Sequence, residues 1–150
     1  MNAYVRFGLM IATSTVVMFG LMYLNTYALD HVLFSETRAY MALLMGAVMA
    51  VIMIGFMWSM HENRKANVGI LAGAVVVFVG SLWLVRSQET VQDSSWMKAM
   101  IPHHSIAILT SERAEISDAR VRDLADRIIK TQREEIAEMN RLIADLEADR

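Results

Sequence analysis

Two methionines and two histidines are concentrated in the segment from Trp96 to His104, in the pattern M-x-x-M-x-x-H-H. Residues three and four positions apart share a face of a helix, so Met97, Met100 and His104 are expected on one side, with His103 on the flank beside Met100. Thioether sulfur and imidazole nitrogen are soft donors, which favour monovalent copper or silver over zinc, magnesium or calcium. The chain has no Cys, so a soft site must use Met. We therefore predict that this segment binds Cu(I) or Ag(I).

Three apolar segments precede this motif and are long enough to cross a bilayer, which takes about 20 residues. They are Ala3–Leu24, Ala39–Met60 and Val68–Val85. Tyr and Trp residues lie near the segment ends, as in the aromatic belts of membrane proteins. The first segment is long for a signal peptide and is followed by no clear small-x-small cleavage site. We therefore predict three transmembrane helices in residues 1–86.

The basic residues predict the orientation of these helices. Arg6 lies near the amino terminus, and Arg64 and Lys65 lie between the second and third segments. Because cytoplasmic loops are enriched in Lys and Arg, we expect both regions in the cytoplasm. Three crossings then place the rest of the chain outside the cytoplasm, as a linker over residues 87–93 and a domain over residues 94–150. The bilayer is thus one expected partner.

The tail is a charged helix former, with nine basic and thirteen acidic residues between positions 87 and 150. This acidic excess argues against nucleic-acid binding. We predict one helix from about Asp93 to Ala114, kinked at Pro102. A turn and a cap at Ser117 should follow, and then a second, antiparallel helix from about Asp118 to Leu146.

An apolar stripe on each tail helix predicts how the two helices pair. On the first helix the predicted stripe is Met97, Met100, His104, Ala107, Ser111 and Ala114. On the second it is Ala125, Ile128, Gln132, Glu135, Met139, Leu142 and Leu146, flanked by Ile129, Ile136 and Ile143. Two helices bury little core, so we predict a four-helix bundle completed by a second copy, or packing on the membrane half. Gln132 and Glu135 either orient a histidine ring or fix the helix register, and the sequence leaves both open.

Residues 93–143 resemble the bacterial "domain of unknown function 305" family. The resemblance rests on Met-Ile-Pro-His-His-x-x-Ala-Ile at 100–108 and on the later I-I-x-x-Q-x-x-E-I-x-x-M pattern at 128–139. It implies a ferritin-like helical bundle, and some members are periplasmic proteins that bind copper or silver and contribute to metal resistance. The implied ligands are Met97, Met100, His103, His104 and Met139. Ser105 and Thr110 depart from the pattern, because the family often has Gln and Met there.

Other Met and His residues have simpler interpretations. Met41, Met45, Met49, Met53 and Met57 recur every four residues in the second apolar segment. A thioether ladder could pass Cu(I), but Met also fills irregular gaps between helices, and we favour packing. We expect His31 to be a solvated loop residue and His61 an interfacial anchor. No nucleophile arrangement, phosphate loop or dinucleotide motif is visible, so we do not predict an enzyme.

Taken together, the sequence predicts an all-α protein with three transmembrane helices followed by a two-helix ferritin-like half-bundle. We expect it in the bacterial plasma membrane, with its tail in the periplasm and as a homo-oligomer. Its expected function is to bind soft monovalent metal for buffering, resistance or delivery, with a metal transporter or chaperone as a further partner. The alternative is a helical interaction or oligomerisation module that serves a membrane partner without binding metal.

Overall fold

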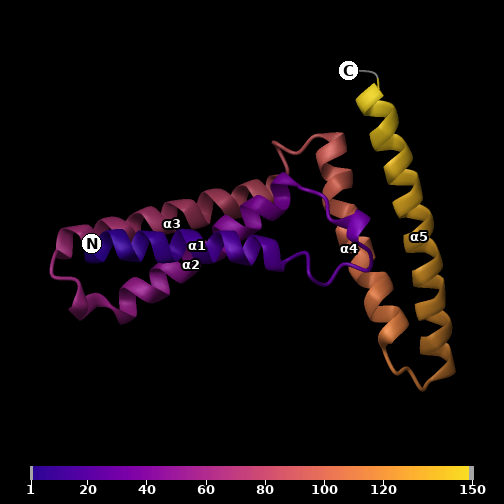
Figure 1. The fold of residues 1–150 in the computed structure, drawn as a ribbon, viewed down its shortest axis with the longest axis horizontal. Helices are drawn as coiled ribbons and strands as arrows, with labels where there is room; N and C mark the ends of the chain where they lie inside the picture. Colours follow the sequence, from indigo (N-terminus) through magenta and orange to yellow (C-terminus); the bar gives the residue numbers. More distant parts are fainter. Residues whose placement is uncertain (1, 149–150) are drawn as a thin grey trace. The chain divides into compact units, whose positions relative to one another are not determined.

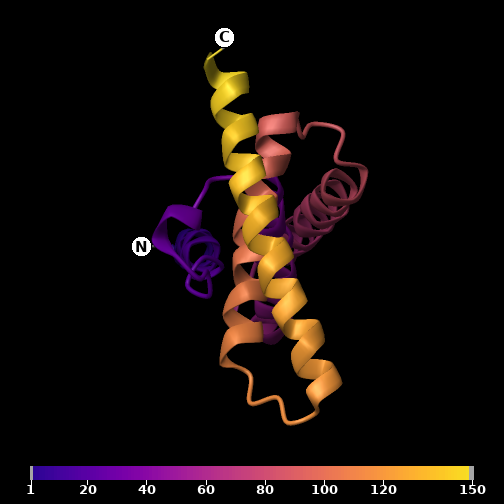
Figure 2. The same ribbon diagram turned by 90° about the vertical axis from the view of Figure 1, so that its right-hand side faces the viewer.

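The computed structural model describes residues 2–148, and over this range the protein is entirely helical, with five α-helices, two short 3-10 turns and no strand (Figures 1 and 2). The elements are α1 (Ala3–Leu21), η1 (Leu29–His31), α2 (Glu36–Phe56), η2 (Trp58–Met60), α3 (Arg64–Ser87), α4 (Asp93–Arg113) and α5 (Ala119–Ala148). The predicted all-α fold class is confirmed.

Two compact units make up the described chain. The membrane unit contains the described residues up to Met22 together with Thr37–Thr90. The tail unit contains Tyr23–Glu36 together with the described residues from Val91 onward. Most of the residues between the first two apolar segments therefore group with the tail helices.

The membrane unit consists of α1, α2 and α3, which run alongside one another in Figure 1. All three helices are long and apolar enough to span a membrane, as the sequence predicts. Their shared core is formed by Phe7 of α1, Ala50 and Ile54 of α2, and Ala74 of α3. At Gly46, α2 approaches α1 so closely that an added Cβ would meet the Thr15 hydroxyl. Small residues at such contacts let membrane helices approach each other closely.

The tail unit is built on the antiparallel pair of α4 and α5, which lie side by side in both views (Figures 1 and 2). Helix α4 continues through Pro102 from Asp93 to Arg113. Helix α5 begins at Ala119, and Asp118 rather than Ser117 caps it, because the Asp118 carboxylate accepts a hydrogen bond from the Arg120 N–H at 2.8 Å.

The buried stripes of both tail helices differ from the prediction. The core of the tail unit contains Met97, Ile101, Ile108, Ile136, Met139 and Ile143. On α4 the buried positions include Ile101, Ser105 and Ile108 in place of Met100, His104 and Ala107. On α5 the predicted members Ile128, Leu142 and Leu146 are exposed, and Ile136 and Ile143 are buried instead. On each helix the buried stripe is therefore shifted from the predicted one by about one residue position. Met97, Ala125 and Met139 belong to both the predicted and the observed stripes.

The packing of the segment Tyr23–Glu36 against α4 explains this rotation. Helix α4 contacts this segment as well as α5. Ser105 of α4 is fully buried and accepts a hydrogen bond from the Tyr27 backbone N–H at 2.6 Å. Leu33 packs against the core between α4 and α5, and the Tyr23 hydroxyl donates to the Leu33 carbonyl at 2.8 Å. Because α4 contacts two neighbours, its buried surface is broader than a single coiled-coil seam.

Candidate metal centre

Three of the predicted thioethers lie together in the tail unit. Met97 of α4 and Met139 of α5 are 5% and 6% exposed and belong to the same core cluster. Met100, three residues after Met97, is partly buried and packs against this cluster. The structure therefore brings methionine residues of both helices into one core cluster.

His104, four residues after Met100 on α4, meets a carboxylate of α5. Its Nδ1 is 3.1 Å from Oε2 of Glu135, and the Gln132 amide donates a hydrogen bond to the same oxygen at 3.2 Å. The Glu135 oxygen lies off the direction of the Nδ1–H bond, so the buried Nδ1 atom has an ionic partner but no hydrogen bond among the described residues. This arrangement favours the interpretation that Gln132 and Glu135 orient a histidine ring.

The electrostatic surroundings keep His104 neutral. Burial lowers the pKa of His104 below its usual value of 6.5, the Glu135 carboxylate opposes this shift, and His103 adds to it. A neutral imidazole is the form that can bind a metal ion. His104 is therefore available as a ligand at neutral pH.

His103 does not share the position of His104. Its side chain is exposed, and the centroids of the two rings are 6.2 Å apart with the ring planes tilted by 55°. Adjacent residues on a helix point about 100° apart, and α4 keeps this divergence through Pro102. In this structure the His104 imidazole is partly buried against Glu135, and the His103 imidazole lies at the surface.

A third imidazole, which the sequence analysis placed in solvent, approaches α4 from another side. His31 in η1 has a side chain only 12% exposed, and its Nδ1 is 2.8 Å from the Ser105 hydroxyl. Its Nε2 is 3.9 Å from the Asp30 carboxylate. The expectation of a solvated loop histidine is therefore wrong. Ser105 is the α4 residue that receives His31, and no local pattern in the sequence connects these two positions.

A small cavity of about 230 Å³ lies near this contact in the tail unit. It is lined by Tyr27, Ala28, His31, Ile108, Arg133 and Ile136. The Arg133 guanidinium lies over the Tyr27 ring, 5.8 Å from its centroid, and pairs with Glu112. This cation already has partners, and the cavity lies next to the thioether core without including its Met residues.

The donor set in the tail unit is suited to a soft ion. Within residues 2–148, no three His, Cys, Asp or Glu side chains are close enough together to hold a metal ion. Hard divalent ions prefer several oxygen ligands, and structural zinc prefers four Cys or His ligands. Thioethers with one imidazole instead match Cu(I) or Ag(I).

The Met residues of α2 do not all face the same surroundings. Met41 is exposed, whereas Met53 and Met57 pack against the core of the membrane unit. A row at four-residue spacing drifts around a helix, so different members meet different neighbours. This placement agrees with the packing interpretation of the row.

Comparisons with known proteins give one family and one relative. The family model described as "Domain of unknown function (DUF305)" matches residues 83–147. A protein named "Uncharacterized protein L153" from Acanthamoeba polyphaga mimivirus is 32% identical over 102 residues, which cover 63% of this chain and 67% of that protein. No solved structure matches significantly.

Proposed function

Since the chain belongs to the DUF305 family, we propose that it is a membrane-anchored protein whose tail unit binds Cu(I) or Ag(I). Two observations support this proposal: Glu135 of α5 pairs with His104 of α4, and methionines of both helices belong to the core of the same unit. The ligands are Met97, Met100, Met139 and His104. His103 is the surface ligand that a small rotation of its side chain, or a second copy, would add.

The tautomer of His104 supports this assignment. The Glu135 carboxylate, 3.1 Å from Nδ1, favours the proton on that nitrogen by electrostatic attraction, although the two atoms are not aligned for a hydrogen bond. The neutral ring then carries its lone pair on Nε2, which becomes the metal-binding atom. A carboxylate next to the other ring nitrogen fixes the orientation of a ligating imidazole and raises its basicity.

The membrane unit supplies the setting for this site. Three helices of sufficient length and apolarity precede α4. With Arg6, Arg64 and Lys65 on the cytoplasmic side, an odd number of crossings places the tail unit outside the cytoplasm of a bacterial cell. A metal site in that position suits buffering, resistance or delivery to a transporter or chaperone.

An exposed apolar stripe on α5 favours assembly with a second copy. Its members are Val121, Leu124, Ile128, Leu142 and Leu146, all of which are exposed. Within each half of α5 they recur in steps of three or four, and a gap separates Ile128 from Leu142. All five follow one face of the helix. The stripe lies next to the buried face, so the apolar surface of α5 is broader than its contact with α4 covers, as is typical of a bundle larger than two helices. We include a homodimer of tail units in the proposal, with this stripe at its centre.

The proposal is tested by Cu(I) competition titration of the full chain in detergent micelles. Met97→Leu, Met139→Leu and His104→Asn should each weaken binding by at least about tenfold, the lower range of effects reported for metal-site partners. Met41→Leu is the matched control, because Met41 is an exposed methionine outside the cluster. Equal affinities in all variants would exclude this site. The competing function, an interaction module without metal, predicts unchanged assembly in the His104 variant and no saturable Cu(I) binding.

A further inference from the structure

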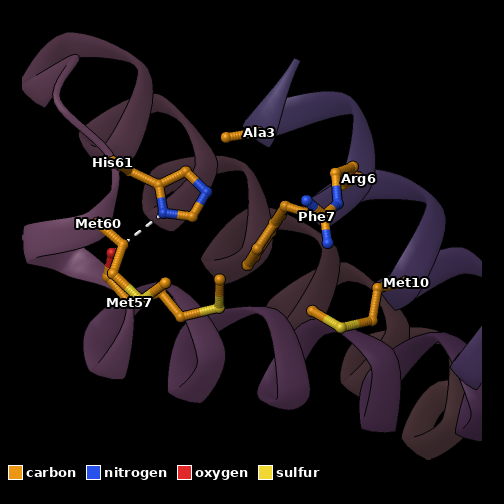
Figure 3. A pocket seen from close by; sticks show the side chains of 7 residues that line it. All are labelled: Ala3, Arg6, Phe7, Met10, Met57, Met60 and His61. Atoms are coloured by element: carbon orange, nitrogen blue, oxygen red, sulfur yellow. Dashed lines mark hydrogen bonds between the residues drawn. The ribbon is translucent and has the colours of Figure 1, made fainter. Parts of the chain in front are cut away.

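The end of the membrane unit where α1 begins and α2 gives way to α3 contains a second concentration of sulfur and imidazole. A cavity of about 400 Å³ there is lined by Ala3, Arg6, Phe7, Met10, Met57, Met60 and His61 (Figure 3). The sequence analysis expected His61 to be an interfacial anchor. In the structure the residue is instead 4% exposed and lies inside the unit.

Aromatic and polar contacts fix the position of the His61 ring. It meets the Tyr4 ring edge-on at 4.9 Å between centroids and the Phe7 ring at 5.8 Å. Behind it, fully buried Asn67 donates a hydrogen bond to the His61 carbonyl at 3.0 Å and accepts one from the Tyr4 hydroxyl at 2.9 Å. The backbone and ring of His61 are thus held by α1 and α3 together.

The hydrogen bonding of the ring leaves one nitrogen unused. His61 Nδ1 is 3.0 Å from the Met57 carbonyl oxygen, which can only accept, so Nδ1 must carry the proton and donate. In the neutral ring Nε2 then bears a lone pair. This atom is buried and has no hydrogen-bond partner within residues 2–148. A buried acceptor without a donor costs about 1–3 kcal/mol, so its retention calls for an explanation.

From this geometry we infer that His61 Nε2, with the thioethers of Met57, Met60 and Met10, forms a second site for a soft monovalent metal ion in the membrane unit. A backbone carbonyl on the opposite ring nitrogen is the usual arrangement for a metal-binding histidine. Figure 3 shows the Met57 and Met10 side chains extending toward one another beside the Phe7 ring, whereas His61 Nε2 points toward α1, so binding would require these flexible methionine side chains to turn toward Nε2. One imidazole and two or three thioethers form a neutral donor set that suits Cu(I) or Ag(I).

Among the described residues that line the cavity, Arg6 is the one charged group, and it opposes a bound cation. Its guanidinium is on a long side chain near the start of α1, and such side chains extend toward the aqueous interface of a bilayer. Arg6 should therefore weaken the site without blocking it. Replacing it with Gln should strengthen Ag(I) binding, because the Coulomb repulsion disappears.

The second site shares its metal class with the proposed tail site but uses different residues and does not depend on it. In the proposed orientation the loop that carries His61 faces the cytoplasm, whereas the tail unit lies outside. The two sites would then serve opposite sides of the membrane.

The test is an Ag(I) titration of the full chain in lipid nanodiscs, followed by the ¹⁵N resonances of the histidine side chains. The wild type should bind at the membrane site with a large shift of the His61 Nε2 resonance. His61→Asn keeps an amide in place of the Nδ1 donor and removes Nε2, so it should lose one equivalent of Ag(I). Met57→Leu keeps the ring and should weaken this equivalent by at least about tenfold.

Matched controls separate this site from the tail site and from misfolding. Met53→Leu changes a neighbouring methionine of α2 that does not line the cavity, and it should retain full binding. His104→Asn should remove the tail equivalent and leave the His61 shift unchanged, so either proposal can fail alone. If His61→Asn does not fold, the His61 Nε2 shift in the wild type and the Ag(I) affinity of Met57→Leu still test the inference. An unshifted His61 Nε2 resonance at saturating Ag(I), or a Met57→Leu protein with unchanged binding, would overturn the inference.

Discussion

Two isoleucines of α5 allow the rotated packing of the tail unit to be tested with one substitution type. Ile136 is 5% exposed and belongs to the core, whereas Ile128 is 36% exposed and was the residue that the sequence placed in the seam. Both are interior residues of the same helix, so changing either to Ala alters helix propensity by the same few tenths of a kcal/mol. The difference between the two variants therefore reports side-chain packing alone.

The expected magnitudes follow from burial. Truncating a buried Ile to Ala costs about 2–5 kcal/mol, through lost burial and the cavity left behind. Ile136 already borders a cavity of about 230 Å³, so its packing is incomplete on one side and we expect about 2–3 kcal/mol. Ile128 retains much of its exposure in the folded protein, and its truncation should cost about 1 kcal/mol or less.

Hydrogen exchange of the α4 backbone amides in the full chain measures this difference, because it reports the free energy of opening of the tail unit without requiring the membrane unit to unfold. Ile136→Ala should increase amide exchange in α4 by at least about fivefold more than Ile128→Ala, since the expected difference is about 1 kcal/mol or more and 1.4 kcal/mol corresponds to a factor of ten. The measurement should be made at protein concentrations at which the chain does not self-associate. Equal effects, or a larger effect at Ile128, would refute the packing described above.

Three further predictions concern other parts of the fold. Gly46→Ala should destabilise the membrane unit by about 1–3 kcal/mol through crowding against Thr15, whereas Gly55→Ala, with open space around it, should not. Equal thermal unfolding of the two variants in micelles would contradict the close approach of α2 to α1 at Gly46. The pKa of His104 is lowered by burial, so its contribution to stability is complete above pH 6.5 and is lost as the pH falls through 6.5 toward the lower folded pKa. The pH dependence of tail unfolding should therefore be shallower in His104→Asn, by at most about 1.4 kcal/mol per pH unit, and identical slopes would contradict it. Ser105→Ala removes the acceptor of the Tyr27 N–H, at a cost of about 1–3 kcal/mol, so exchange of that amide should accelerate at least about fivefold; unchanged exchange would show that the contact does not hold the segment.

Most of the helical framework could be predicted from the sequence, because it follows from local patterns. The apolar runs located all three membrane helices within a few residues of their bounds, and the charged tail gave α4 and α5. The cluster of Met97, Met100 and Met139 followed from helical spacing and from the resemblance. The helices depend on neighbours within one or two turns, which the sequence displays directly, whereas the association of Met139 with α4 depended on the resemblance as well.

The surroundings of His31 and His61 could not be predicted, because they depend on distant contacts. His31 meets Ser105, 74 positions later, and the ring of His61 packs on Tyr4 and Phe7 of α1. No local pattern indicates such pairs. The rotation of the tail stripes has the same origin, since the segment Tyr23–Glu36 gives α4 a second packed neighbour that a two-helix count does not include.

Silver K-edge X-ray absorption of the full chain in a His61→Asn, Met57→Leu background tests the central claim most directly, because that background leaves the tail unit as the proposed site. The proposed ligands Met97, Met100, Met139 and His104 predict sulfur together with nitrogen in the first coordination shell of one bound Ag(I). A first shell of oxygen or nitrogen alone, or the absence of tightly bound silver, would contradict the assignment of a soft-metal site to the tail unit.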